Sequence, residues 1–416
     1  MASAQGQLGG RRTAGGVAPS PTAAPARHPI AQPYPSRPRF VVNGRFLGRP
    51  VTGVERVARE LVRALSAQVL AEGRGSGAGH AAPVVVTPTP VAEPDGSPLR
   101  TRVRAGWVRP GHLWEQLVLP FAYPGAPLLN LANSAPLLRR GQVLFVHDAA
   151  VLDIPDCFRA SYRALHRTLL AGVTRLTDAT ICTVSDFSAE RLAHHEPGLA
   201  GRIRVVPPGI DHVHRIEPAG DLRERYGLEP GGFVLAVASA ARHKNGRLLA
   251  AAAEGIAALG LKIAVVGDRS SSVFSAPEHA AAPHVVHLGY VDDPSLRALY
   301  EAAFAFVYPS LYEGFGLPPL EAMALGCPAV VSRIRPLTDN CAAGALQIDP
   351  HDPAELVAAL AALRDPDRRR ALVAEGRRRT AGLTWNAAAR RLLAIVREKG
   401  AAGASRPRPR LPGWST

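Results

Sequence analysis

The sequence predicts an α/β protein with two domains, each built on a doubly wound parallel sheet. With 416 residues, the chain is long for one domain and long enough for two domains that each bury a core. Short aliphatic and β-branched runs alternate with helical segments along most of it, as at LKIAVVGD, VVHLGYV and FAFVYPS. Short apolar runs separated by helices are typical of parallel strands that are covered on both faces.

The segment 304–332, FAFVYPSLYEGFGLPPLEAMALGCPAVVS, shows this alternation most fully. Its first residues predict a strand over 304–308, closed by turn-forming residues. Pro318 and Pro319 suit the first turn of a helix, where the missing N–H costs nothing and the fixed φ is already helical. We therefore expect a helix from about 318 to 326, after which a glycine and a proline end the helix and a second strand begins.

Two carboxylates and two glycines in this segment indicate a ligand site. Glu313 lies beyond the carboxyl end of the strand, where open α/β sheets bind ligands, and Glu321 is expected in the first helical turn. Gly314 and Gly316 let the backbone approach an anion that the helix N-terminus attracts. A diphosphate flanked by two hydroxyl-bearing sugars would use all of these groups. The alternative is that Glu313 is a solvated loop residue and Glu321 only complements the helix dipole.

The spacing of Glu313 and Glu321 in this segment resembles the E-x7-E motif of the retaining, nucleotide-sugar-dependent glycosyltransferases of family 4. The resemblance extends over roughly residues 38 to 400. It implies the GT-B fold, in which two Rossmann-like domains face a cleft and a C-terminal helix crosses back to the first domain. It also implies a catalytic role for Glu313. It assigns donor binding within the motif to Gly314, Phe315, Gly316, Leu317 and Glu321.

The predicted strands and helices divide the chain into five parts. The first residues are rich in Ala, Gly, Pro and Arg without periodicity, which predicts disorder. The predicted parts are a disordered tail at 1–37, an acceptor-side domain at 38–211, a nucleotide-sugar-binding domain at 212–384, the returning helix at 385–400 and a disordered tail at 401–416.

The first domain is expected to open with a strand, a glycine-bearing loop and a helix within residues 39–65. The helix should begin at Thr52 or Gly53. The resemblance implies that Gly53 lets the backbone reach the donor phosphate and the acceptor. The alternative is that Gly53 only marks the start of a helix. The segments 112–120 and 128–137 resemble family stretches that line the acceptor side.

A further strand in the first domain, QVLFVHD, is expected to end in His147 and Asp148. A histidine at the carboxyl end of a strand can face the cleft, and the resemblance implies that His147 touches the donor sugar and is catalytic. Metal binding by His147 is the alternative, but no second potential metal ligand lies at a spacing typical of a metal site. Asp365 and Asp367 form a D-x-D between predicted helices, whereas the metal site of GT-A enzymes needs one at a strand end. We therefore expect no metal and no other cofactor.

The second domain is expected to open with a strand that runs into the loop ARHKNG. In the resemblance, Lys244 matches the catalytic lysine that binds the donor diphosphate. Ser239 stands where the family often has an arginine, so Arg242 is expected to compensate. The chain has three lysines among 49 basic residues, which makes a lysine in this loop conspicuous; a surface lysine is the alternative. The loop from Gly289 to Val291 resembles the family's base-binding edge, which adds Val291 to the donor site.

The formal charge of +15 favours anionic partners, which include nucleic acid, anionic lipid and phosphorylated substrates. Arg159, Arg163 and Arg167 fall on one face of a predicted helix. This face suits contact with an anionic membrane, and a solvated basic stripe is the alternative. The resemblance favours sugar and lipid-linked partners over nucleic acid.

Localisation is predicted from cysteines and hydropathy. The four cysteines have neither CxxC spacing nor an obvious disulfide framework, which favours a reducing cytoplasm. No apolar run reaches transmembrane length, and the N-terminus lacks the apolar core of a signal peptide. We expect a cytoplasmic protein with peripheral contact at the inner face of the cell membrane.

The function that the resemblance implies is transfer of a hexose from a nucleotide diphosphosugar, of the GDP-mannose or UDP-sugar type, with retention of configuration. The acceptor would be a saccharide or lipid-linked saccharide, in cell-envelope or exopolysaccharide synthesis. A nucleotide-sugar epimerase of the same fold is an alternative, as is a phosphorylase, which would need a lysine bound to pyridoxal phosphate. A non-catalytic nucleotide-sugar-binding protein is the alternative from another class.

Overall fold

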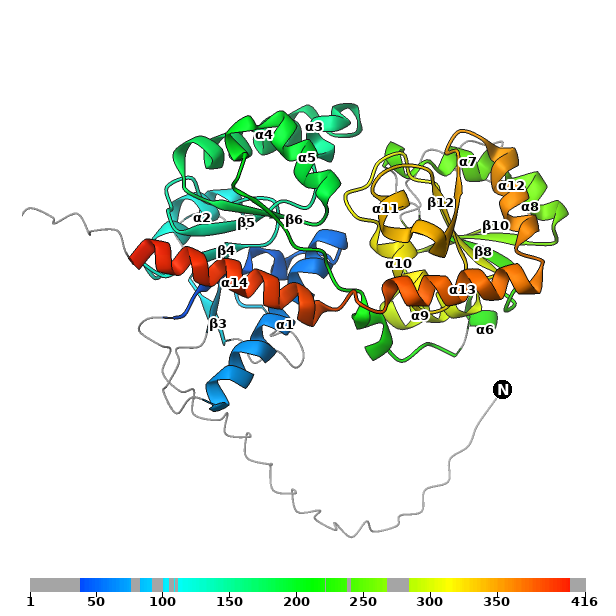
Figure 1. The fold of residues 1–416 in the computed structure, drawn as a ribbon, viewed down its shortest axis with the longest axis horizontal. Helices are drawn as coiled ribbons and strands as arrows, with labels where there is room; N and C mark the ends of the chain where they lie inside the picture. The colour runs from blue at the N-terminus through cyan, green and yellow to red at the C-terminus, as the bar shows by residue number, and fades with distance from the viewer. Residues whose placement is uncertain are drawn as a thin grey trace, which may run out of the picture. The chain divides into compact units, whose positions relative to one another are not determined.

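The computed structural model describes residues 38–75, 83–91, 100–104, 108, 111–220, 222–237, 241–267 and 284–404. Within these residues the chain forms two sheets, each with helices packed on both faces (Figure 1). Every strand pairing in both sheets is parallel. Both sheets belong to one compact unit, Pro35–Thr416. The predicted fold class is confirmed.

The first sheet has seven strands among the described residues, in the order β3-β2-β1-β4-β5-β6-β7. They are β1 (Val41–Asn43), β2 (Val84–Thr87), β3 (Arg100–Val103), β4 (Leu128–Asn130), β5 (Gln142–Phe145), β6 (Thr180–Thr183) and β7 (Ile203–Val205). Its helical segments are η1 (Gly44–Gly48), α1 (Gly53–Gly75), α2 (His112–Leu117), η2 (Leu119–Phe121), α3 (Ala150–Asp153), η3 (Pro155–Cys157), α4 (Ala160–Leu176), α5 (Asp186–His195) and η4 (Pro197–Leu199). The strand order reverses between β1 and β4.

The second sheet has six strands among the described residues, in the order β10-β9-β8-β11-β12-β13. They are β8 (Phe233–Val237), β9 (Lys262–Val266), β10 (Val285–Gly289), β11 (Ala305–Tyr308), β12 (Ala329–Ser332) and β13 (Ala345–Ile348). Its helical segments are η6 (Arg242–Lys244), α7 (Gly246–Ala251), α8 (Ala253–Ala258), α9 (Asp293–Ala302), α10 (Leu317–Ala324), α11 (Leu337–Cys341), η7 (Ala342–Gly344), α12 (Pro353–Ala362) and α13 (Pro366–Thr380). η5 (Asp211–Arg215) and α6 (Leu222–Tyr226) connect the sheets. The order reverses between β8 and β11.

Strand β11 lies at the centre of the second sheet, as its apolar sequence requires. Val307 pairs with Val330 of β12 on one side and with Ala236 of β8 on the other. All of β11 is buried, since alternate side chains pack into the cores on the two faces of the sheet. The run FAFVY is therefore continuous in apolar character because water reaches neither face.

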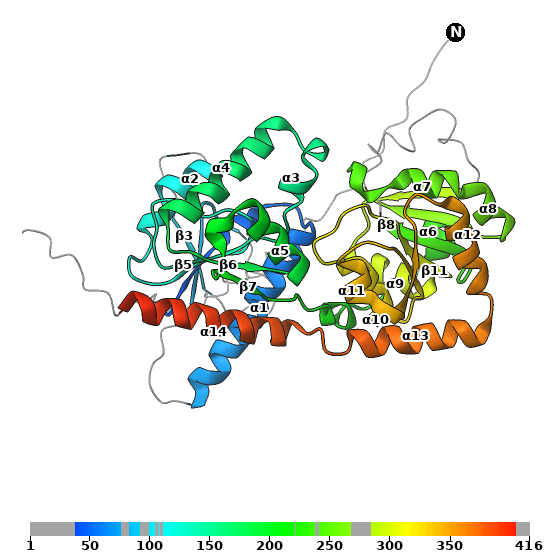
Figure 2. The ribbon, with the colours of Figure 1, turned by 45° about the horizontal axis from the view of Figure 1, so that its top comes forward.

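Helix α14 (Trp385–Ala404) returns to the first sheet, as predicted (Figures 1 and 2). Gln68 of α1 donates a 2.7 Å hydrogen bond to the carbonyl of Asn386. Near the other end of α14, the ammonium of Lys399 lies 3.7 Å from a carboxylate oxygen of Asp178. The helix continues past Gly400 to Ala404, so the tail expected at 401–416 is helical over its first four residues. The rest of that tail and the tail expected at 1–37 lie outside the described residues.

Helix α10 begins at Leu317, so one detail of the predicted motif is wrong. Pro318 and Pro319 occupy its first turn as expected, and Gly316, with φ of 91°, precedes it. Glu321 therefore lies beyond the first turn, and no acidic residue stands within that turn. Its carboxylate is not placed to complement the helix dipole.

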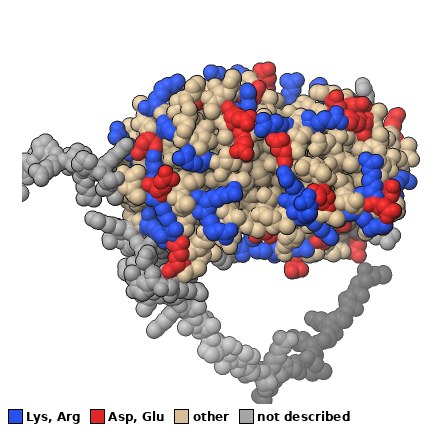
Figure 3. Space-filling model, in the orientation of Figure 1, with Lys and Arg blue, Asp and Glu red and all other residues tan. Residues whose placement is uncertain are grey.

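The described helices include none with both the length and the apolar character needed to span a membrane. Basic side chains are spread over the face drawn in Figure 3 and are interspersed with acidic ones. The net charge of +15 is therefore not gathered into one block on this face.

Candidate active site

The two residues at the centre of the candidate site, Lys244 and Glu313, lie where the strand order of the second sheet reverses. η6 follows β8, and the loop that carries Glu313 follows β11, its neighbour in the sheet. Asn245, in the left-handed region with φ of 54°, joins the two loops because its side-chain amide donates to the carbonyl of Pro309 at 3.0 Å. Leu311 donates its N–H to the carbonyl of His243 at 2.7 Å. Ligands of doubly wound sheets bind at such a reversal.

Lys244 and Glu313 form a direct ion pair. The ammonium of Lys244 donates to a carboxylate oxygen of Glu313 at 2.6 Å and to the hydroxyl of Tyr308 at 2.8 Å. Burial opposes both charges, but their mutual attraction outweighs it, raising the pKa of Lys244 and lowering the pKa of Glu313. Both residues are therefore ionised at neutral pH.

Tyr308 is a member of this cluster that the sequence did not indicate. It is the last residue of β11 and is 2% exposed. Burial, followed by the charge of Glu313, raises the pKa of its phenol, so the hydroxyl stays protonated. Its position at the carboxyl end of a central strand was the one signal that could have identified it.

The loop after Glu313 packs against the first domain without space for a side chain. A Cβ atom built on Gly314 would lie 2.8 Å from Cβ of Asp148 and 3.0 Å from the carbonyl oxygen of His147. The Gly314 carbonyl accepts hydrogen bonds from the hydroxyls of Ser185 at 2.6 Å and Ser188 at 3.2 Å. The structure thus brings the loops after β5 and β11 together, which spacing in the sequence could not show.

His147 is held as a neutral imidazole. Its Nε2 lies 2.9 Å from the carbonyl oxygen of Leu131, and its backbone N–H donates to the side chain of Asn133. Burial lowers the pKa of His147 to about 4. Because a carbonyl only accepts, Nε2 carries the proton and Nδ1 is the acceptor. Across the described ranges, no group of three or more His, Cys, Asp or Glu residues is arranged to hold a metal.

Glu321 belongs to a different buried cluster from Glu313. One carboxylate oxygen lies 3.3 Å from Nε2 of His212, and the other accepts a 3.3 Å hydrogen bond from the hydroxyl of Tyr300. The indole of Trp385 donates to Nδ1 of His212 at 3.1 Å. Glu321 is 9% exposed. Through His212 and Trp385 it joins α10 to the segment between the two sheets and to the start of α14.

The remaining predicted donor-site residues have varied surroundings. Gly53 is the first residue of α1 and is exposed. No atom lies within 4 Å of the position that a Cβ atom on this residue would occupy. Val291 is buried just after β10. The Phe315 carbonyl accepts a hydrogen bond from Asn340, and Leu317 starts α10. Two predicted residues complete the set: Arg242, whose exposed side chain lines a groove beside Lys244, and Ser239, which lies outside the described residues.

The reversal point of the first sheet carries a buried polar network that the sequence did not indicate. Glu115, fully buried on α2, accepts hydrogen bonds from Asn43 at 2.7 Å and Ser134 at 2.9 Å. Arg45 approaches the same carboxylate at 3.5 Å. Burial opposes the charge of Glu115, but His112, Arg45 and these hydrogen bonds outweigh burial and lower its pKa. Glu115 and Ser134 fall in the two segments expected on the acceptor side.

Both halves of the chain match known families. Residues 51–214 match the family described as Glycosyltransferase Family 4, and residues 221–379 match Glycosyl transferases group 1. The O-antigen chain mannosyltransferase B of Escherichia coli is 43% identical over 100 residues, which cover 24% of this chain and 26% of that protein. The D-inositol 3-phosphate glycosyltransferase 1 of Catenulispora acidiphila is 32% identical over 226 residues, or 50% of this chain and 54% of that one. The matched regions thus span about a quarter of the length of the mannosyltransferase and about half of the length of the D-inositol 3-phosphate glycosyltransferase.

Solved structures share the fold at low sequence identity. Sucrose-phosphate synthase from Thermosynechococcus elongatus superposes with a TM-score of 0.64 at 23% identity, covering 88% of this chain and 100% of that chain. Anabaena Alr3699/HepE, solved in complex with UDP and glucose, gives 0.66 at 15% identity, covering 87% and 100%. These likenesses confirm the GT-B arrangement of two Rossmann-like domains. Together the two matches cover most of the chain, which therefore belongs to the glycosyltransferases described as Glycosyltransferase Family 4 and Glycosyl transferases group 1.

Proposed function

We propose that this protein transfers a hexose from a nucleotide diphosphosugar to a saccharide or lipid-linked saccharide, with retention of the anomeric configuration. The observation that carries the proposal is the cluster of Lys244, Glu313 and Tyr308 at the reversal point of the second sheet. It supplies a permanently charged ammonium where a diphosphate would lie and a carboxylate where a sugar hydroxyl would lie.

Lys244 would stabilise the negative charge that develops on the departing diphosphate. Its raised pKa keeps it protonated through the reaction, and Tyr308 and Glu313 hold it in place before the donor arrives. Such preorganised charge lowers the barrier of an oxocarbenium-like transition state. The start of α10 would add N–H groups from Leu317 and Leu320 only, because Pro318 and Pro319 have none.

The donor is proposed to be of the GDP-mannose or UDP-sugar type, bound without a metal or another cofactor. Val291 would border the base, and Glu321 would accept from the ribose. His147, neutral above about pH 4, would offer Nδ1 to a hydroxyl of the transferred sugar. Among the similar proteins are a mannosyltransferase and a structure with UDP and glucose, which supports both donor types.

The acceptor is proposed to be met at an anionic membrane surface, in cell-envelope or exopolysaccharide synthesis. Helices α2 and α4 lie next to each other, since the rings of His112 and His166 are 6.5 Å apart. Both expose large apolar side chains, namely Leu113 (61%), Leu117 (42%), Tyr162 (42%) and Leu165 (37%). Arg159 and Arg167 are also exposed, whereas Arg163 is half-buried and lies 3.9 Å from Asp156. Apolar and basic side chains together suit an anionic bilayer.

Thermal unfolding with a panel of nucleotide diphosphosugars tests the proposal. The true donor should raise the melting temperature by mass action, and its consumption should yield a product whose anomeric configuration NMR can compare with that of the donor. Lys244→Gln should abolish both effects. The matched control is Lys262→Gln, which removes an exposed lysine from the start of β9. If no donor stabilises the protein, the proposal is wrong; stabilisation with an epimerised free nucleotide sugar would identify an epimerase, and stabilisation without turnover a binding protein.

A further inference from the structure

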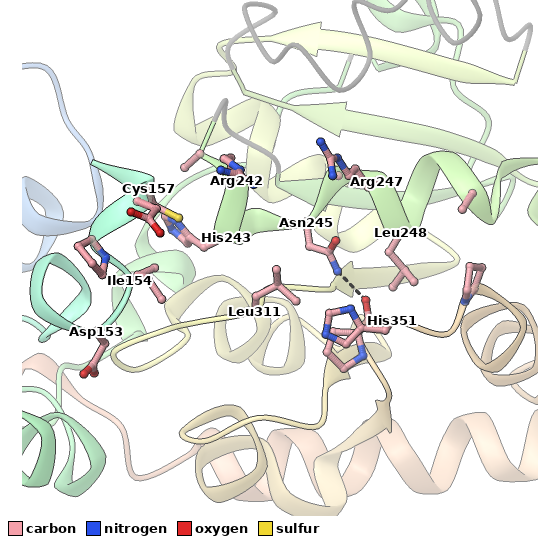
Figure 4. Close-up of a pocket in the computed structure, with 17 residues that line it drawn as sticks. Asp153, Ile154, Cys157, Arg242, His243, Asn245, Arg247, Leu248, Leu311 and His351 are labelled. Atoms are coloured by element: carbon pink, nitrogen blue, oxygen red, sulfur yellow. Dashed lines mark hydrogen bonds between the residues drawn. The ribbon is translucent and has the colours of Figure 1, made fainter. Parts of the chain in front are cut away.

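A groove of about 710 Å³ lies beside the Lys244–Glu313 pair, and among the predicted donor-site residues it is Arg242 that lines it. One wall comes from α3 and η3 of the first domain, from Asp153 to Cys157. The other comes from η6 and α7 of the second domain, and the turn after β13 closes one end with His351 (Figure 4). Its floor includes Leu311, two residues before Glu313.

The strand order fixes where this groove stands relative to the proposed donor. Val291 follows β10 at one edge of the second sheet, Glu313 follows β11 in the middle, and His351 follows β13 at the other edge. Neighbouring strands are about 4.8 Å apart, so β10 and β11 are separated by about 14 Å, roughly the reach of a nucleoside diphosphate. A donor with its base at β10 directs its sugar toward β13. The groove therefore lies on the side of the transferred sugar that is opposite the base.

Two arginines and two aspartates line the groove, and the two aspartates are paired with arginines outside its lining. Arg242 and Arg247 both line it with exposed side chains, and neither has a hydrogen-bond or ion-pair partner within the described residues. The acid Asp153 is already engaged. Burial opposes its charge, but hydrogen bonds from Arg191, His195 and Tyr312 lower its pKa to about 2. Asp156, at the rim, lies 3.9 Å from Arg163.

Much of the remaining lining is apolar, and three prolines contribute to it. Ile154, Pro155, Leu311 and Pro350 present carbon surface between the two arginines and His351. Sugar rings have apolar faces that pack on such surface, while guanidinium groups bind phosphate and carboxylate through paired N–H groups.

We propose that this groove binds the acceptor, and that the acceptor is a saccharide carrying a phosphate or a carboxylate group. The assignment of the bound sugar as acceptor rests on the proposed glycosyl transfer. The anionic group would lie against Arg247 and Arg242, and the ring to be glycosylated would lie over Leu311, next to Glu313.

Cys157 allows the groove to be probed without any assay of transfer. It lines the groove and is partly exposed, whereas Cys182, Cys327 and Cys341 are buried. A maleimide should therefore label Cys157 selectively, and Cys157→Ser should abolish the label. The probes are glucose 6-phosphate, glucuronic acid, glucose and inorganic phosphate, each added to the full chain. An occupied groove slows labelling by the factor one plus ligand concentration over Kd, which is about threefold at twice Kd.

Slower labelling with glucose 6-phosphate or glucuronic acid, but not with glucose or inorganic phosphate, supports the proposal. The two anionic arms distinguish a phosphate from a carboxylate. Arg247→Gln should abolish the protection, and Arg368→Gln, which removes an exposed arginine at α13, should retain it.

Three results would overturn the proposal. They are equal labelling with all four probes, equal protection by inorganic phosphate alone, and protection by a nucleotide diphosphosugar alone, which would assign the groove to the donor. Protection by the anionic sugars in a protein that transfers nothing would leave the binding site intact and refute only the proposed function.

Discussion

The hydroxyl of Ser185 donates a 2.6 Å hydrogen bond to the carbonyl oxygen of Gly314, 129 positions later in the chain. Ser185 is the N-cap of α5 in the first domain, and Gly314 directly follows Glu313 in the second. The conformation of the Glu313 loop therefore depends on contact with the first domain. We infer that donor-site geometry is complete only when this contact is made.

Ser185→Ala should lower kcat about fivefold to tenfold, because a net hydrogen bond of about 1 kcal/mol that holds the Glu313 loop is lost. The helix cap is lost as well, at about 1 kcal/mol of unfolding free energy. Ser185→Asp separates the effects, since aspartate can cap α5 but cannot donate to Gly314; it should recover stability without recovering kcat. Ser188→Ala, which leaves the shorter bond in place, is the matched control. Equal kcat for all three variants and wild type would show that the contact is only structural.

Lys244→Gln should reduce kcat/KM about 100-fold to 1000-fold, because it removes the main charge opposite the diphosphate. It should also destabilise the protein, since Glu313, with a side chain 11% exposed, loses its counter-ion. The double variant Lys244→Gln/Glu313→Gln removes both charges, so it should regain stability while staying inactive. Tyr308→Phe should cost only about fivefold. Chemical denaturation and steady-state kinetics measure both quantities, and an active double variant would refute the role of the pair.

Glu313→Gln and Glu321→Gln should differ in kinetic signature. A ribose contact is made equally in the ground and transition states, so Glu321→Gln should mainly raise the donor KM. Glu313→Gln should lower kcat as well, because it changes the surroundings of Lys244 and of the transferred sugar. Steady-state kinetics over a range of donor concentrations separates the two. Identical signatures would mean that the roles are assigned wrongly.

Buried His147 should make stability fall as the pH drops from about 6.5 to about 4. Its folded pKa of about 4 lies below the ordinary 6.5, so the unfolded chain binds the extra proton in this window and acid favours unfolding. The shift corresponds to about 3 kcal/mol over the window. His147→Gln should make the slope shallower without abolishing it, because the pKa of His166 is also lowered to about 4. Urea unfolding at several pH values measures the slope, with exposed His214→Gln as control; an unchanged slope in His147→Gln would contradict the neutral buried imidazole.

The membrane proposal predicts salt-sensitive binding to anionic vesicles. Each basic residue near such a surface contributes about 1 kcal/mol, and the contribution decreases as salt shortens the Debye length. Arg159→Gln/Arg167→Gln should weaken co-sedimentation with phosphatidylglycerol vesicles, and Leu113→Ser/Leu117→Ser should weaken it at high salt too. Arg368→Gln/Arg391→Gln removes the same charge from exposed positions of α13 and α14 and is the matched control. Equal binding by all of these proteins, or none by wild type at low salt, would refute the role of α2 and α4.

Local patterns in the sequence were enough to predict the fold class and most of the architecture of the motif. Apolar runs, the two prolines at 318 and 319 and the glycine before them specify strand, loop and helix because these signals act over a few residues. Lys244 and Glu313 each follow a predicted strand, which placed both residues at the carboxyl ends of the strands of one sheet. The start of α10 was misplaced by one residue, enough to put Glu321 in the wrong turn.

Which of these residues contact one another depends on the tertiary structure. Lys244 and Glu313 are 69 positions apart, and their contact requires β8 and β11 to be neighbours, an order that no local pattern encodes. Tyr308 enters the cluster through the same neighbour relation, and Ser185 reaches Gly314 only because the two domains pack together. Propensity and turn chemistry operate between residues close in the chain, whereas strand order and domain packing depend on burial of the whole core.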